Sequence, residues 1–165
     1  MSTINLRVWL IIPDAEAATV KNTLIRRMGC GDILADVKKE RLFSIDVDSG
    51  DPEVLAKAFA KELVNENKES HKVLIDTLSF EGAYVPVKVS LHIEDGEAIS
   101  TRDRLRNRLG FKNVMSVKKA TIWKLYLKGD DKERAAKEIA EGLLINPHKD
   151  SYEILSLAED ASLSR

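Results

Sequence analysis

Alternating apolar and polar residues predict strands along much of the chain. Residues 4–12 carry apolar side chains at every second position: Leu6, Val8, Leu10 and Ile12. Because Trp9 and Ile11 lie on the opposite face, this strand is predicted to be buried on both sides. Residues 87–94 also alternate, but Lys88 and Glu94 stand among their outward residues, which predicts a half-solvated strand.

Helices are predicted where an acidic cap precedes an apolar stripe at helical spacing. Asp14 precedes a helix over residues 15–28, and Asp51 with Pro52 at the first helical position starts a second. Their stripes are Ala17, Val20, Leu24 and Met28 in the first, and Leu55, Ala58, Phe59 and Leu63 in the second. The other predicted elements are strands near 32–38, 41–48 and 72–75, then strand 87–93, helix 96–109, strands 113–119 and 121–128, helix 131–145 and strand 151–155.

The same pattern is written twice in the chain. Val37-Lys38-Lys39 recurs as Val117-Lys118-Lys119, 80 residues later. The strand and helix that follow keep this shift, and upstream it becomes 81, so that Gly29 falls on Gly110. A constant shift through strands and a helix is not expected by chance. The sequence therefore predicts a duplicated domain.

The predicted domains are repeat one over residues 1–76, a linker over 77–86, repeat two over 87–156 and a tail over 157–165. Each repeat has the order β-α-β-β-α-β, which is the order of ferredoxin-like folds. The fold prediction is therefore α+β, with two tandem units, antiparallel sheets and helices on one face. A repeat of this size has a marginal core on its own. The two repeats are expected to form an intramolecular pseudo-dimer, packed either face to face or edge to edge.

Composition and charge narrow the classes of function. Charged residues make up 32% of the chain and nearly cancel to a net charge of −1, which argues against a nucleic-acid binder. Cys30 is the one cysteine, so no internal disulfide can form and a reducing cytoplasm is the expected location. The first residues lack a signal-peptide layout, and no apolar run is long enough for a membrane span, so no membrane partner is expected.

No sequence motif with a catalytic mechanism is found. The chain contains no glycine-rich phosphate loop, no Gly-x-Ser-x-Gly and no His-Glu-x-x-His. His71, His92 and His148 lack metal-ligand spacing and are predicted to be surface residues. Cys30 follows a helix end whose dipole would raise the thiol pKa, so packing is favoured over nucleophilic chemistry. The prediction is that no residue is catalytic, cofactor-binding or metal-binding.

Charged and aromatic residues supply candidate contacts with a partner. Four arginines occur at every second position: Arg102, Arg104, Arg106 and Arg108. This spacing distributes them around a helix, which favours a solvated helix surface over an anion-binding site. Asp103 and Glu97 are their expected partners. The pairs Lys38-Lys39 and Lys118-Lys119 either protect a sheet edge or form a two-fold related docking surface. Among the aromatic residues on predicted strands are Trp9, Phe43, Trp123 and Tyr126. Packing is expected for them, and the outward Trp9 is the best interface candidate.

The second repeat ends with Leu143-Leu144-Ile145-Asn146-Pro147, followed by a strand that contains Tyr152. This ending and the order of elements resemble PurS, the small subunit of phosphoribosylformylglycinamidine (FGAM) synthase. The first repeat has the same layout, with Leu63-Val64-Asn65-Glu66-Asn67 in that place and no proline. The Gly-Lys pair that usually opens the second long strand of the family is replaced, for example by Ala120-Thr121. The chain thus resembles two diverged, tandem-fused PurS-like domains.

The resemblance implies a non-catalytic assembly subunit of FGAM synthase in de novo purine biosynthesis. Such a subunit bridges the synthetase subunit (PurL) and the glutaminase subunit (PurQ), to which ATP, magnesium and glutamine belong, and helps ammonia pass between them. Whether the chain is itself an enzyme, and whether it forms a further homodimer, is left open. The alternative is a tandem small-molecule-binding regulatory module, because ACT-type domains have a similar layout. The expected partner interface comprises Trp9, Ile11, Lys38, Lys39, Lys118, Lys119, Asn146 and Pro147.

Overall fold

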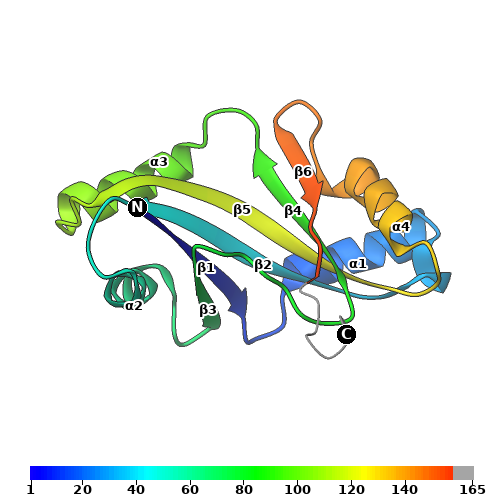
Figure 1. The fold of residues 1–165 in the computed structure, drawn as a ribbon. Coiled ribbons are helices and arrows are strands. Elements are labelled where there is room, and N and C mark those ends of the chain that lie inside the picture. The colour runs from blue at the N-terminus through cyan, green and yellow to red at the C-terminus, as the bar shows by residue number, and fades with distance from the viewer. Residues whose placement is uncertain (158–165) are drawn as a thin grey trace, which may run out of the picture. The chain divides into compact units, whose positions relative to one another are not determined.

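Six strands and four helices form an α+β fold in the computed structural model, which describes residues 1–157 (Figure 1). The strands are hydrogen-bonded in the order β3-β1-β2-β5-β4-β6. The helices are α1 (Ala15–Arg27), α2 (Pro52–Leu63), α3 (Gly96–Asp103) and α4 (Lys132–Ile139). The strands are β1 (Ser2–Leu10), β2 (Leu34–Val47), β3 (Glu69–Ile75), β4 (Val85–Leu91), β5 (Val114–Leu127) and β6 (Asp150–Ile154). The predicted tail over 157–165 lies outside the described residues except for Leu157.

The prediction of two short strands in the middle of each repeat is wrong. Strands 32–38 and 41–48 are one continuous strand, β2, and strands 113–119 and 121–128 are likewise one strand, β5. Glu40 lies at the predicted break between the two strands of the first repeat. In the structure Glu40 is 1% exposed and accepts two hydrogen bonds from the Arg7 guanidinium, at 2.8 and 2.9 Å. A charge paired in this way can remain inside a strand.

The helices begin at the predicted capping residues. Asp14 and Asp51 both accept hydrogen bonds from backbone N–H groups of the first helical turn. The predicted helices 96–109 and 131–145 correspond to α3 and α4, each of which continues into a π-helical turn, over Arg104–Arg108 and Ala140–Leu144 respectively.

The π turn after α4 explains why the residue shift between the two repeats changes after the second helix of each repeat. Leu63 corresponds to Leu143, a shift of 80, but Asn65 corresponds to Asn146, a shift of 81. At the end of α2, the Val64 N–H donates to Ala60 O, four residues back. At the equivalent place the Ile145 N–H donates to Ala140 O, five residues back. The wider turn holds one extra residue without breaking the helix. The shift of 80 that holds along the helix therefore becomes 81 after it.

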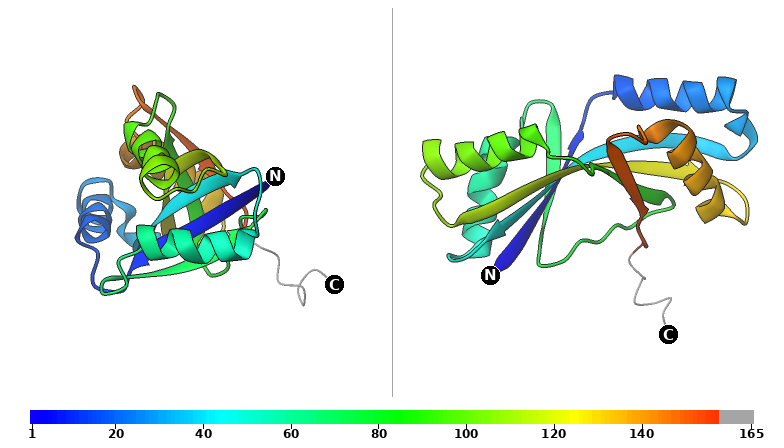
Figure 2. Two further views of the ribbon diagram at one scale, coloured as in Figure 1. Left: turned by 90° about the vertical axis from the view of Figure 1, so that its left-hand side faces the viewer. Right: turned by 90° about the horizontal axis from the view of Figure 1, so that it is seen from above.

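The described chain divides into two compact units that do not coincide with the predicted repeats. Unit 1 consists of Met1–Pro13, Glu40–Leu78 and Ile93–Ala120, and unit 2 of Asp14–Lys39, Ser79–His92 and the part from Thr121 on. Unit 1 therefore contains α2 and α3, and unit 2 contains α1 and α4 (Figures 1 and 2). Each unit takes one helix from each half of the sequence.

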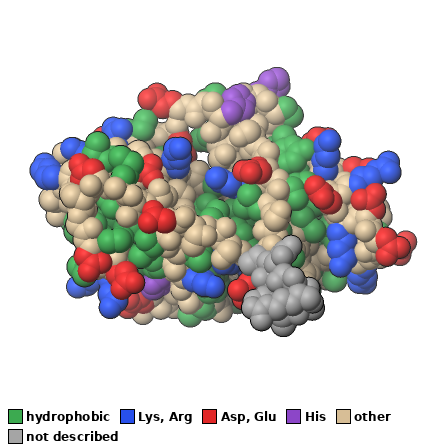
Figure 3. All heavy atoms as spheres, viewed as in Figure 1, with side chains coloured by type: hydrophobic (Ala, Val, Ile, Leu, Met, Phe, Trp, Pro, Cys, Tyr) green, Lys and Arg blue, Asp and Glu red, His purple; other side chains and the backbone are tan. Residues whose placement is uncertain are grey.

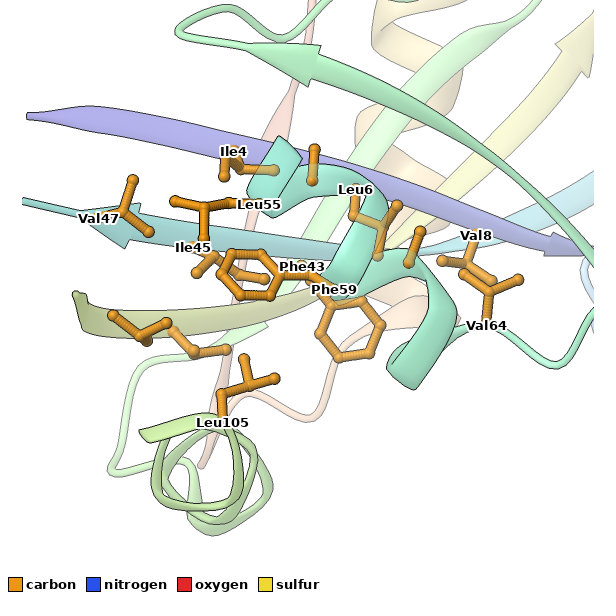
Figure 4. Packing of buried hydrophobic residues seen from close by; sticks show 14 residues of the cluster. Ile4, Leu6, Val8, Phe43, Ile45, Val47, Leu55, Phe59, Val64 and Leu105 are labelled. Atoms are coloured by element: carbon orange, nitrogen blue, oxygen red, sulfur yellow. The ribbon is translucent and has the colours of Figure 1, made fainter. Parts of the chain in front are cut away.

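The core of unit 1 lies between α2, the π turn after α3 and the sheet (Figure 4). Its buried members are Ile4, Leu6, Val8, Phe43, Ile45, Val47, Leu55, Ala56, Phe59, Ala60, Val64, Leu105, Val114 and Val117. The ring of Phe59 meets that of Phe111 edge to face, with 5.2 Å between centroids. Leu105 is fully buried in this core although it comes from the second half of the chain.

In the core of unit 2, most residues come from the second half of the chain and fewer from the first half, the reverse of unit 1. Its buried members are Ala17, Leu24, Cys30, Leu34, Val37, Val87, Val89, Trp123, Leu125, Leu127, Ala136, Ile139 and Ala140. Leu24, which aligns with Leu105, is also fully buried and comes from the first half. Each half of the sequence thus completes the core of the unit to which the other half contributes most.

Three apolar residues that the sequence pattern placed inward are exposed. Ile12 is 47% exposed because β1 ends at Leu10, and Ile93 is 52% exposed because β4 ends before it. Met28 follows the end of α1 and is 39% exposed. Among the described residues, no helix has the length and apolar character needed to cross a membrane.

Candidate interaction surfaces

Trp9 and Ile11 lie at the end of β1 in unit 1. Trp9 is half-buried and stands opposite Ser70 of β3, which is an edge strand of the sheet. Ile11 follows the strand and is 60% exposed, while its N–H donates to Lys68 O at 2.8 Å. Ile11 is therefore fixed by its backbone and presents its side chain to solvent.

The sheet face of unit 1 that points away from the core carries a polar network. Asp46 accepts hydrogen bonds from the Thr3 hydroxyl at 2.6 Å and the Ser116 hydroxyl at 2.8 Å. Asn5 accepts from the Ser44 hydroxyl at 2.7 Å and donates to Thr77 O at 2.7 Å. These bonds tie β1, β2 and β5 together through their side chains.

The pKa of Asp46 reflects this network. The hydrogen bond from Thr3 lowers the pKa below its ordinary value, and the hydrogen bond from Ser116 and the charge of Lys118 act in the same direction. Partial burial opposes them. The carboxylate is therefore held in its charged form by donors on neighbouring strands.

The same face of unit 1 contains a buried ion pair. Arg7 and Glu40 are 6% and 1% exposed, and the guanidinium holds the carboxylate with Nε at 2.8 Å and Nη2 at 2.9 Å. Two parallel bonds of this kind fix both side chains in one geometry. The pair specifies how β1 and β2 meet.

Lys39 and Lys119 occupy equivalent places in the two units. Lys119 donates to Glu97 of α3 at 2.7 Å, and its ammonium lies 5.3 Å from the centre of the Phe43 ring. Lys39 is hydrogen-bonded to Glu16 of α1 and lies 5.9 Å from the centre of the Trp123 ring. The hydrogen bond and charge of Lys119 lower the pKa of Glu97. Both lysines therefore hold the start of a helix to the sheet.

Lys38 and Lys118, in contrast, are exposed. In unit 2 the Lys38 ammonium lies 5.4 Å from the centre of the Tyr126 ring, and Tyr126 is 5.4 Å from Tyr84 between ring centroids. Lys124 lies 4.9 Å from the centre of the Tyr84 ring. This face of unit 2 thus combines aromatic rings with cations.

Asn146 and Pro147 form an exposed corner of unit 2. The Asn146 side chain accepts from the His148 N–H at 3.0 Å, and its own N–H donates to Asp150 at 2.9 Å. The Tyr152 hydroxyl donates to Glu141 at 2.7 Å, and this hydrogen bond raises the pKa of Tyr152. The corner is therefore held by hydrogen bonds and presents Pro147 to solvent.

The equivalent corner of unit 1 has the same turn but a different surface. The Asn65 side chain accepts from the Asn67 N–H at 3.1 Å, and the Asn65 N–H donates to Glu69 at 2.9 Å. Beside this turn lies a concavity of about 590 Å³. It is lined by Lys57, Ala60, Lys61, Val64, Asn65, Glu66 and His71. The sequence analysis did not single out these residues, although all but His71 lie close together in the sequence.

The arginine run has structural partners. Arg102 pairs with Asp103 at 3.1 Å, and Arg104 pairs with Glu62 of α2 at 3.2 Å. Arg106 donates to Val114 O. The expected partner Asp103 is confirmed for Arg102, whereas Glu97 pairs with Lys119 instead.

Cys30 and the histidines lie where the sequence placed them. Cys30 is 8% exposed, and burial, with a contribution from the Glu138 charge, raises the pKa of its thiol as predicted, although burial rather than a helix dipole is the main cause. His71, His92 and His148 are exposed. Within residues 1–157, no three His, Cys, Asp or Glu side chains are grouped so that they could hold a metal ion.

The candidate residues thus belong to several surfaces. Trp9, Ile11, Lys118 and Lys119 lie in unit 1, and Lys38, Lys39, Asn146 and Pro147 lie in unit 2. Acidic and basic side chains are interspersed over the face shown in Figure 3, without a continuous basic area. Ile11 and Pro147 are the exposed apolar residues among these candidates.

Comparison with known families identifies a match in the second half of the chain. Residues 83–157 match the family described as PurS: Phosphoribosylformylglycinamidine (FGAM) synthase. The matched segment runs from β4 to the end of the described residues. Among curated proteins, none is similar enough to count as a relative.

Proposed function

Since residues 83–157 form a domain of the PurS family of FGAM synthase, we propose that this chain is a non-catalytic assembly subunit of that enzyme in de novo purine biosynthesis. Membership of the family implies association with the FGAM synthase complex. In the proposal, the chain bridges the synthetase subunit (PurL) and the glutaminase subunit (PurQ) in the cytoplasm. ATP, magnesium and glutamine are then bound by those subunits. The family match is the observation that carries the proposal.

The proposal includes an internal pseudo-dimer. The repeat in the sequence supports it, and so does the exchange of equivalent helices, since Leu105 of the second half is buried in unit 1 and Leu24 of the first half in unit 2. Unit 1 orders its strands β3-β1-β2-β5, which matches a ferredoxin-like sheet when β5 takes the place of the second strand. In this interpretation, one chain supplies both subunits of a dimer.

The interface in the proposal uses exposed residues on each unit. On unit 1 it contains Ile11 beside the half-buried Trp9, and on unit 2 the Asn146-Pro147 corner. Large apolar residues at an interface contribute most when they become fully buried by the partner. Lys39 and Lys119 are bound to Glu16 and Glu97, so Lys38 and Lys118 are the better candidates for contacts with the partners.

The test is co-purification of the full chain with the synthetase and glutaminase subunits, in the presence of glutamine and nucleotide. A stable ternary complex is expected, and absence of association under these conditions would overturn the proposal. Ile11→Asp should weaken the complex at least tenfold, because it places a charge in an apolar contact. Ile93→Asp is the matched control, since Ile93 is similarly exposed at 52% and lies outside the proposed interface.

A further inference from the structure

The concavity on unit 1 has an apolar floor and a cationic rim. Ala60 and Val64 are 5% and 7% exposed and belong to the core of the unit, so they close the concavity from below. Lys57 and Lys61 lie one helical turn apart on α2, and both are exposed. Residues at this spacing are neighbours on a helix surface, with Cβ atoms about 5–6 Å apart. Two ammonium groups can therefore reach one ligand.

The remaining lining residues add polar groups of other kinds. His71 of β3 pairs with Val8 of β1, so the two side chains lie on the same face of the sheet. This is the face that α2 covers. Asn65 is held by its turn, with the Asn67 N–H donating to its side-chain oxygen. Glu66 is the one acidic residue of the lining. The site thus offers cationic donors together with a carboxylate that can accept hydrogen bonds from hydroxyl groups.

The equivalent place in the second half of the chain carries different side chains. Lys57 has its counterpart in Lys137, but Lys61 corresponds to Glu141 and His71 to Tyr152. Glu141 and Tyr152 are hydrogen-bonded to each other at 2.7 Å. In the half that matches the family, two side chains therefore satisfy each other at the position where unit 1 presents Lys61 and His71.

We propose that this concavity binds a small phosphate monoester that carries hydroxyl groups, of the size of a sugar phosphate. Lys57 and Lys61 hold the phosphate, because a monoester carries a charge of about −1.5 to −2 at neutral pH and lysine ammonium groups bind phosphate as point charges. Asn65 and Glu66 contact the hydroxyl groups. The volume of about 590 Å³ lies in the range of small-molecule sites, about 300–1,000 Å³. The inference concerns the first half of the chain and is independent of the assembly role.

The experiment is calorimetric titration of the full chain with ribose 5-phosphate as the probe. Saturable binding of one molecule per chain is expected. Inorganic phosphate, which lacks hydroxyl-bearing carbons, and the dicarboxylate glutarate should both bind at least tenfold more weakly. Equal or tighter binding of either would overturn the assignment of the ligand class, and absence of saturable binding of ribose 5-phosphate would overturn the site.

Matched variants locate the binding. Lys57→Gln and Lys61→Gln should each weaken binding about tenfold, the loss expected for one charge-assisted hydrogen bond. Lys137→Gln, at the counterpart of Lys57, should leave it unchanged. The double variant Lys61→Glu/His71→Tyr copies the second half and should abolish binding while thermal unfolding shows a folded chain. Binding that survives the double variant, or that Lys137→Gln weakens equally, would overturn the proposal.

Discussion

Units 1 and 2 use the same elements to build their cores but differ on the sheet face that points away from them. Unit 1 has Thr3 and Asp46 at paired positions of β1 and β2, joined by a hydrogen bond of 2.6 Å. Unit 2 has Tyr84 and Tyr126 at the equivalent positions, with their rings 5.4 Å apart. One face is held by directional hydrogen bonds and the other by aromatic and cationic contacts.

The ion pair shows the same divergence. Arg7 and Glu40 correspond to Lys88 and Ala120, so unit 2 has a single, half-exposed charge where unit 1 has a buried pair. Some core positions keep the same residue in both units: Leu24 and Leu105, Ala56 and Ala136, and Ala60 and Ala140. Others change size, since Leu55 and Phe59 correspond to Ala135 and Ile139. The cores thus stay apolar in both units even where side chains change size, while the outer sheet face accepts different chemistry as long as each buried polar group is paired.

The largest expected effect comes from separating the two halves. Residues 79–157 alone lack Leu24, Leu34 and Val37, which complete the core of unit 2. Loss of one large buried aliphatic side chain costs about 2–5 kcal/mol. The loss of these three together is therefore comparable to the whole stability of a typical domain, about 5–15 kcal/mol. We expect the fragment to be unfolded as a monomer and to fold only when two copies exchange helices, as measured by circular dichroism and sedimentation at increasing dilution.

The fragment covering residues 1–78 serves as the comparison, because it lacks Leu105, Val114 and Val117 from the core of unit 1. It should behave in the same way. A stable folded monomer of either fragment would contradict the exchanged arrangement of the cores.

The next largest effect concerns the buried ion pair of unit 1. Glu40→Ala removes two hydrogen bonds from the Arg7 guanidinium, which stays largely buried. Breaking one side of such a pair costs about 3–5 kcal/mol, and denaturant unfolding of the full chain measures it. Replacing both partners, as Arg7→Met/Glu40→Leu, should recover most of the loss because no charge remains buried. Lys88→Met, at the half-exposed counterpart in unit 2, should change stability by less than about 1 kcal/mol.

The smallest effect depends on pH. Asp46→Asn should reduce stability by about 1–2 kcal/mol at pH 7, because Thr3 and Ser116 then donate to a neutral acceptor. The folded-state pKa of Asp46 is lowered, so its contribution is present above the pKa of the unfolded chain, about 3.9, and is lost as the pH falls through the folded value. The difference between wild type and variant should therefore shrink below about pH 4. A difference that stays constant down to pH 2 would contradict the role of the carboxylate, and Asp48→Asn, at an exposed neighbour, is the control.

Much of the local structure could be predicted because its causes are local. Asp14 and Asp51 cap helices through bonds to residues two or three positions away, and the apolar alternation of β1 follows from the period of a strand. The continuity of β2 could not be predicted in this way. Glu40 lies inside this strand with its charge paired to Arg7, 33 residues away, whereas the equally continuous β5 has Ala120 at that place.

The candidate surfaces were harder to predict from the sequence. The sequence singled out the lysine pairs but gave Lys38 and Lys39 the same weight, and only the fold distinguishes the exposed Lys38 from Lys39, which is bonded to Glu16. The concavity beside α2 was missed altogether. Most of its lining residues lie on α2 and the turn after it, between Lys57 and Glu66, and the approach of β3 adds His71.

The sequence by itself determined that the chain contains one pattern twice, where its helices start and which residues are apolar enough for a core. Periodicity and capping are properties of neighbouring residues, so they can be read along the chain. Only the tertiary structure decided which half completes which core. Leu24 and Leu105 have the same local sequence requirements wherever they pack, and the choice between packing within a half and packing across halves depends on contacts between residues far apart in the chain.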